Sequence, residues 1–213
     1  MANSTVYTEC IPNHARLRAL TAALLSRAEL SAAELVAEFG DLAVCEQIAN
    51  ARDAFAVAAT AAKAETEAGD LRTADADLER LQQSVTGRDR AERLLTLHLA
   101  AGFAADSLRT LIQWRADVEG GRDEQQFELL ELTAPMNELV GALSSLFADD
   151  TILDDRLAMW GRRIAGDCAV WARTLLGLST AEAAGEAEDT VEQLLSTSFA
   201  EHSRRMNVLK LAA

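Results

Sequence analysis

The run Leu94-Leu-Thr-Leu-His98-Leu-Ala-Ala-Gly-Phe-Ala-Ala-Asp-Ser-Leu108-Arg-Thr-Leu-Ile112 has the periodicity of a long helix. The segment Thr86-Gly-Arg-Asp89 precedes it and predicts the helix start, and the pattern continues to about Val118. Because the apolar stripe recurs at spacings of three and four, its members share one helix face. They are Leu94, His98, Ala101, Ala105, Leu108 and Ile112.

Two stripes of the same kind lie in the C-terminal third of the chain. The segment Asp149-Asp-Thr151 predicts the cap of one helix, and the second helix is expected to begin near Ser179. The first stripe is Leu153, Leu157, Trp160, Ile164, Cys168, Trp171 and Leu175. The second is Val191, Leu195, Phe199, His202, Met206 and Leu209.

The N-terminal part predicts three more helices. The first lies between Thr5 and Arg27, and Pro12 either starts it or kinks it. Ser31-Ala-Ala-Glu34 matches a capping box, in which both side chains bond free backbone N–H groups, so we expect a long helix from there to about Ala68. The polar segment from Asp70 to Gln83 predicts a short helix of mixed charge.

Gly120-Gly121 is the clearest break in the chain. After it, the pattern predicts a helix from about Asp123 to Phe147, with Pro135 in its middle. Long helices joined by short loops favour antiparallel neighbours in a bundle.

The composition agrees with a chain that is all-α. Its 213 residues fit one domain, residues 1–213, and include only two prolines and 5% aromatic residues. Alanine and leucine dominate the apolar 49%, and neither loses much side-chain freedom in a helix. The β-branched and aromatic runs expected of strands are absent from the sequence.

The charge and the cysteines limit the partners and the compartment. A net charge of −14 repels phosphates overall and argues against DNA binding. The three cysteines lie far apart and are odd in number, which is typical of reduced thiols in a cytoplasmic protein. No signal peptide and no apolar run long enough to span a membrane is visible in the sequence.

Five segments have a recognisable pattern. In the C-terminal third they are Arg156-Leu-Ala-Met-Trp160-Gly-Arg-Arg-Ile-Ala-Gly166 and Glu201-His-Ser-Arg-Arg-Met206. The others are Ala37-Glu-Phe-Gly-Asp41, Gly102-Phe-Ala-Ala-Asp106 and Val6-Tyr-Thr-Glu9. In this order they resemble a ferritin-like family related to MiaE-type tRNA hydroxylases. The resemblance implies a ferritin-like antiparallel helical bundle with one or two additional short helices.

The resemblance also implies where a di-metal centre would lie. Such a centre takes a carboxylate from each of two helices and a Glu-x-x-His pair from each of two others. Glu9 and Glu38 match ligand positions, but Asp41 stands where the family has a histidine. Ala101 replaces an aspartate. Leu132 and Pro135 replace an acidic residue and a histidine, so the site is expected to be degenerate.

Two histidines leave an alternative open. His98 and His202 fall within apolar stripes, where a histidine is more often a structural residue than a ligand. If they approached Glu38, then Glu9, Glu38, Asp41, His98 and His202 would form a non-standard site for two iron or manganese ions. Glu131 or Glu138 would be additional donors.

Four arginines invite two interpretations. Arg162, Arg163, Arg204 and Arg205 would suit a phosphate or RNA, or they pair with acidic neighbours, which are abundant in this chain. We favour pairing. The tryptophans are expected to be core or interface anchors, and Cys45 and Cys168 to be small buried residues.

These observations lead to three functional hypotheses. The first is a non-catalytic ferritin-like protein, structural or partner-binding, that has no cofactor. The alternative is a di-iron hydroxylase acting on tRNA through the non-standard ligands. The third, compatible with the first, is association into a homodimer. Motifs of classical hydrolases, kinases and dehydrogenases are absent from the sequence.

Overall fold

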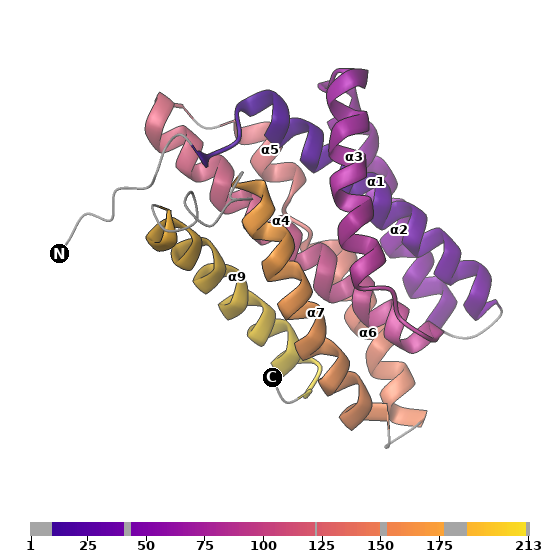
Figure 1. Ribbon diagram of the computed structural model, residues 1–213. Coiled ribbons are helices and arrows are strands. Elements are labelled where there is room, and N and C mark those ends of the chain that lie inside the picture. Colours follow the sequence, from indigo (N-terminus) through magenta and orange to yellow (C-terminus); the bar gives the residue numbers. More distant parts are fainter. Residues whose placement is uncertain (1–9, 41–43, 122, 150–152, 177–186, 212–213) are drawn as a thin grey trace.

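The computed structural model describes residues 10–40, 44–121, 123–149, 153–176 and 187–211 (Figure 1). Within these ranges every regular element is a helix, so the predicted all-α helical bundle is confirmed. No helix in the described ranges is long and apolar enough to cross a lipid bilayer.

Four helices form a closed ring. They are α1 (His14–Phe39), α2 (Val44–Ala64), α4 (Arg90–Glu119) and α6 (Thr133–Asp149). Around the ring, α1 packs against α2, α2 against α6, α6 against α4, and α4 against α1. The largest fully buried side chains include Leu17, Leu20, Ile48, Phe55 and Leu95, so the ring is held together by apolar packing.

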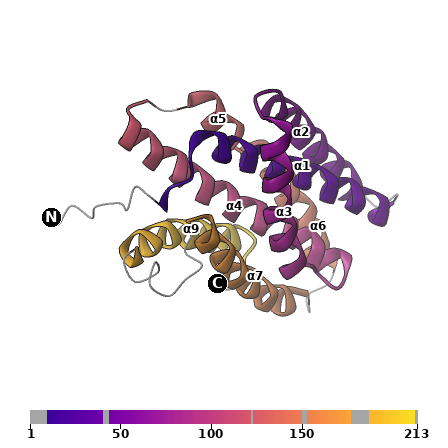
Figure 2. The ribbon, with the colours of Figure 1, turned by 45° about the horizontal axis from the view of Figure 1, so that its top comes forward.

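The remaining helices lie around this ring. The helices α7 (Leu153–Leu175) and α9 (Glu188–Val208) pack on α4 and on each other, on the side away from α1 and α2 (Figure 2). Helix α3 (Ala68–Ser84) lies against α1, and the short α5 (Glu124–Leu129) contacts α1 and α2. Helix α4 therefore has neighbours on several sides.

The predicted central helix is confirmed. It begins after Asp89, whose carboxylate accepts hydrogen bonds from the backbone N–H groups of Ala91 and Glu92, both 3.0 Å long. It ends at Gly120, which has a φ of 74°, a left-handed conformation that glycine adopts without strain. The short polar helix predicted from Asp70 to Gln83 is confirmed as α3.

The predicted capping box at Ser31 is wrong. Helix α1 runs through Ser31 without interruption and ends at Phe39, before Gly40, which has a φ of 59°. The long helix predicted from Ser31 to about Ala68 is therefore wrong, because this segment contains the end of α1 and the separate helix α2. The N-cap is Asn13, whose side-chain oxygen accepts from the N–H of Arg16 at 2.9 Å, so Pro12 lies just before the helix and does not kink it. Because Ala28, Ala32 and Leu35 are all buried, packing favours a continuous helix over the local cap.

The single helix predicted from Asp123 to Phe147 is also wrong. The structure divides it into α5 and α6, and Pro135 lies in the first turn of α6. A proline is tolerated there because the N–H groups of the first turn have no helical partner. The start predicted near Ser179 and residues 150–151 of the predicted cap lie outside the described residues.

Candidate functional site

A buried polar cluster joins α4, α7 and α9. At its centre Arg205 of α9 forms an ion pair with Asp106 of α4, with Nη1 and Oδ2 2.7 Å apart. The guanidinium lies directly over Gly102, where a Cβ atom would be only 2.6 Å from Arg205 Cζ. Gly102 therefore lets the arginine lie close to the backbone of α4.

A second glycine brings α7 close to α9. A Cβ atom on Gly161 would lie 2.5 Å from the sulfur of Met206 and 3.3 Å from Cδ1 of Leu99. The imidazole of His202 is hydrogen-bonded to the backbone of Gly161. Beside it, Trp160 donates its indole N–H to the hydroxyl of Thr96 at 2.9 Å, which links α7 to α4.

Both predicted interior histidines are buried in this cluster. Burial, together with the charges of Arg205 and His202, lowers the pKa of His98 to about 3. Burial and the charge of Arg205 lower the pKa of His202 to about 4. Both imidazoles are therefore neutral at neutral pH, and neither nitrogen of His98 has a hydrogen-bond partner among the described residues.

Aromatic and hydroxyl contacts complete the α4–α9 interface. The ring of Phe103 makes edge-to-face contacts with Phe199 and His202, with ring centroids 5.7 and 6.4 Å apart. Ser107 and Ser198 are both fully buried, and their hydroxyl oxygens lie 3.0 Å apart. The serine hydroxyls of this interface thus pair with each other, whereas both nitrogens of His98 and Nδ1 of His202 have no hydrogen-bond partner among the described residues.

Three of the recognisable segments meet at this cluster. The segment 102–106 supplies Gly102 and Asp106, the segment 156–166 supplies Gly161, and the segment 201–206 supplies His202 and Arg205. In this chain these residues determine how α7 and α9 dock on α4. The spacing of the segments along the sequence did not indicate that they would lie together.

The predicted metal ligands do not converge in the described part of the chain. Glu38 is an exposed residue near the end of α1 and forms an ion pair with Arg93, which also bonds Glu34 at 2.6 Å. His98 and His202 lie in the separate α4–α9 interface. Glu9 and Asp41 lie outside the described residues, within which no group of three or more histidine, cysteine or acidic side chains is placed to hold a metal.

The positions that the resemblance assigns to metal donors are apolar and buried. Ala101, Leu132 and Pro135 are all buried, and none of them carries a donor atom in its side chain. The buried carboxylate of α4, Glu92, lies at its first turn, where it accepts from the N–H of Arg88 at 2.8 Å. These three positions therefore offer no ligand to a pair of iron or manganese ions.

Three of the four arginines of the predicted basic patch pair with acidic residues. Arg205 is largely buried and pairs with Asp106. Arg204 pairs with Glu201 within α9, and Arg163 lies 3.6 Å from Asp167 within α7. Arg162 is exposed on α7.

Sequence reasoning missed Asp106, Gly102 and Glu92 as members of the polar interior. A usable signal was present, because Asp106 and Glu92 are charged residues in or beside an apolar run. The tryptophans and Cys168 are buried as predicted, whereas Cys45 is only partly buried. Burial raises the pKa of the Cys168 thiol, which makes it unreactive.

The chain matches no protein-family model, and no curated protein matches its sequence.

Proposed function

We propose that the chain is a non-catalytic ferritin-like protein, structural or partner-binding, whose bundle keeps the architecture of a di-metal protein without its ligands. The observation that carries the proposal is the replacement of donors by buried Ala101, Leu132 and Pro135. A pair of divalent ions in the interior needs carboxylates and imidazoles that converge, because burying unpaired charge is strongly unfavourable.

The alternative, a di-iron tRNA hydroxylase with non-standard ligands, has less support. It requires Glu38 to approach His98 and His202, whereas Glu38 is neutralised by Arg93 at the surface. A tRNA substrate would also require a basic surface, and Arg163, Arg204 and Arg205 pair with acidic residues.

Metal analysis tests the proposal directly. The full chain would be produced in medium rich in iron and manganese, desalted into metal-free buffer and analysed by mass spectrometry for both elements. We expect well below one ion per chain. The double variant H98L/H202L is the matched control, because the alternative predicts that it loses metal whereas our proposal predicts the same low background. Close to two ions per chain in the wild type would overturn the proposal.

The surface supports a second copy of the chain as the partner. Met159 and Val170 of α7 are 70% and 65% exposed and lie about three turns apart on the same side of the helix. Between them the same face exposes Arg163 and Gly166, so a contact here would combine apolar and arginine side chains, as protein interfaces often do.

Sedimentation tests the association. We expect a species of about twice the 22.9 kDa chain mass at micromolar concentration. Val170→Glu should shift it to the monomer, because it places a charge within the interface. The matched control is Val57→Glu on α2, which replaces another highly exposed valine and should leave the dimer intact. A monomeric wild type would contradict self-association.

A further inference from the structure

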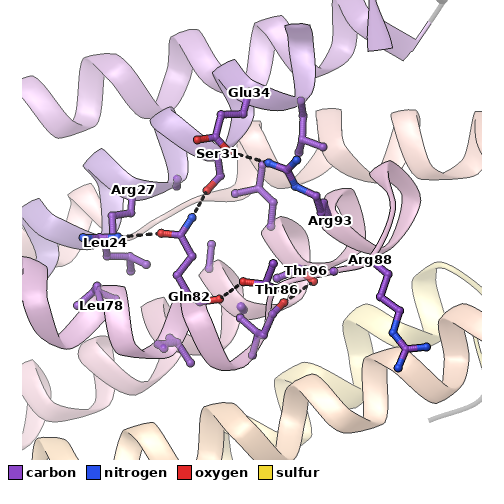
Figure 3. Close-up of a pocket in the computed structure, with 18 residues that line it drawn as sticks. Leu24, Arg27, Ser31, Glu34, Leu78, Gln82, Thr86, Arg88, Arg93 and Thr96 are labelled. Carbon is purple, nitrogen blue, oxygen red and sulfur yellow. Dashed lines mark hydrogen bonds and ion pairs between the residues drawn. The ribbon is translucent and has the colours of Figure 1, made fainter. Parts of the chain in front are cut away.

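A pocket of about 340 Å³ opens between α1, α3 and α4 (Figure 3). All three helices contribute leucines to its lining, namely Leu24, Leu35, Leu78, Leu81 and Leu97. The volume lies in the range of small-molecule sites. At roughly 30 Å³ for a group of the size of a water molecule, it has room for on the order of ten non-hydrogen atoms.

Helix α3 is attached to the bundle by few apolar side chains. Of its 17 residues only Ala74, Leu78 and Leu81 are buried, and both leucines line the pocket. The helix packs mainly against α1, so the pocket occupies the space between α3 and α4. A molecule bound there would therefore contact both helices and bury apolar surface between them.

The polar side chains around the pocket are hydrogen-bonded within the protein. The side-chain amide of Gln82 accepts from Arg27 at 2.8 Å and donates to the Ser31 hydroxyl at 3.3 Å, as Figure 3 shows. The hydroxyls of Thr86 and Thr96 donate to backbone carbonyls at 2.8 and 3.1 Å. These groups therefore have partners without a ligand.

The charged side chains of the lining do not favour an ion in the pocket. Arg27 pairs with Asp75 at 2.7 Å, and Arg93 pairs with Glu34 at 2.6 Å. The third arginine of the lining, Arg88, is directed away from the cavity in Figure 3. A charged ligand would lose hydration on entering the pocket and would find no unpaired opposite charge directed into it.

We propose that this pocket binds a small uncharged molecule that is mostly hydrocarbon, of on the order of ten non-hydrogen atoms. Its apolar part lies against the leucines of α1, α3 and α4, and any polar group that it carries faces the mouth. The driving force is the removal of apolar surface from water, on the ligand and on the leucines. The inference goes beyond the proposed function and does not depend on it.

Calorimetric titration with 1-octanol at neutral pH tests the proposal. Octanoate and octylammonium are matched probes that carry the same alkyl chain and opposite charges. We expect one 1-octanol per chain and no tighter binding of either ion. The affinity should rise roughly fourfold for each methylene added from 1-hexanol to 1-octanol, because each methylene leaves water. No binding of 1-octanol, or tighter binding of either ion, would overturn the proposal.

Variants test whether the alcohol binds in this pocket. Ala101→Leu on α4 and Ala28→Leu on α1 both change residues of the lining. Each should weaken 1-octanol binding by about tenfold or more, because the new side chain takes the space that the alcohol needs. The matched control is Ala33→Leu, which changes an exposed residue of α1 outside the pocket and should bind as the wild type does. Folded filling variants that keep wild-type affinity would also overturn the proposal.

Amide hydrogen exchange gives a measurement that does not depend on the variants. With 1-octanol at about ten times its Kd, local opening of α3 should become up to about tenfold rarer, and its amides should exchange more slowly by that factor. Helix α2 contributes no residue to the pocket and should show a smaller change. Unchanged exchange in α3 would contradict binding between α3 and α4.

Discussion

Arg205 and Asp106 connect α9 to α4 through an ion pair of 2.7 Å that lies over the backbone of Gly102. Both side chains are mostly buried, with exposed fractions of 19% and 14%. Burial raises the pKa of Asp106, while the hydrogen bond and charge of Arg205 oppose that shift. The pair therefore depends on close contact, which only a glycine at position 102 permits.

Gly102→Ala should destabilise the protein by about 1–3 kcal/mol, because the new methyl group displaces Arg205 and weakens a charged interaction in a buried setting. The measurement is urea unfolding followed by circular dichroism. Gly166→Ala is the matched control, since Gly166 is an exposed helical glycine of α7 with no atom within 4 Å of the new Cβ. It should stabilise by about 0.5–1 kcal/mol through helix propensity. Equal effects at both positions would contradict the role of Gly102.

Gly161→Ala should destabilise by about 1–3 kcal/mol through overpacking against Met206, whose Cε would lie 2.6 Å from the added Cβ. Met206→Ala alone should destabilise by about 2–5 kcal/mol because it leaves a cavity. The double variant should be at least about 1 kcal/mol more stable than the sum of the two losses predicts, since the added methyl group occupies the vacated space. Strict additivity in thermal or urea unfolding would exclude this contact.

The two buried histidines predict a loss of stability on mild acidification. In the unfolded chain each takes up a proton near pH 6.5, whereas in the folded protein the pKa of His98 is about 3 and that of His202 about 4. As the pH falls below 6.5, the unfolded state binds more protons. The free energy of unfolding then decreases by up to about 1.4 kcal/mol per pH unit for each histidine.

The pH effect is measured by urea unfolding at several values between pH 7 and 5. His98→Leu should reduce the slope of the unfolding free energy against pH by up to about 1.4 kcal/mol per pH unit, because it removes one titrating group. Arg205 acts on both histidines. It also pairs with Asp106, near Glu201, and the raised pKa of Asp106 acts in the opposite direction near its own titration. A wild type with no slope in this range would contradict the prediction.

Two variants in α1 test whether the helix begins at Asn13 or is capped at Ser31. Asn13→Ala should destabilise by about 1 kcal/mol, because Asn13 is the N-cap that bonds the N–H of Arg16. Ser31→Ala should change the stability by no more than about 0.5 kcal/mol, since Ser31 lies inside a continuous helix. Thermal unfolding of both variants measures the difference, and a larger loss at Ser31 would indicate that the helix is interrupted there.

Much of the helical architecture was predictable because its signals are local. The periodic run from Leu94 to Ile112, the cap at Asp89 and the break at Gly120 depend on residues within a turn or two of one another. The burial of His98 and His202 followed from the same periodicity. At Ser31 the local signal gave a wrong boundary, because packing of the flanking apolar residues outweighed the capping preference of one position. Around Pro135 the periodic pattern hid a break, because a proline is tolerated in the first turn of a new helix, α6.

By itself, the amino-acid sequence determined that this chain is all-α, where its central helix begins and ends, and which of its faces are apolar. Only the tertiary structure decided that Arg205 pairs with Asp106, that Glu38 pairs with Arg93 at the surface, and that a pocket opens between α1, α3 and α4. The physical reason is the range of the forces involved. Helix formation depends on interactions between residues three or four positions apart, whereas ion pairs and cavities depend on residues that meet only after the helices have packed.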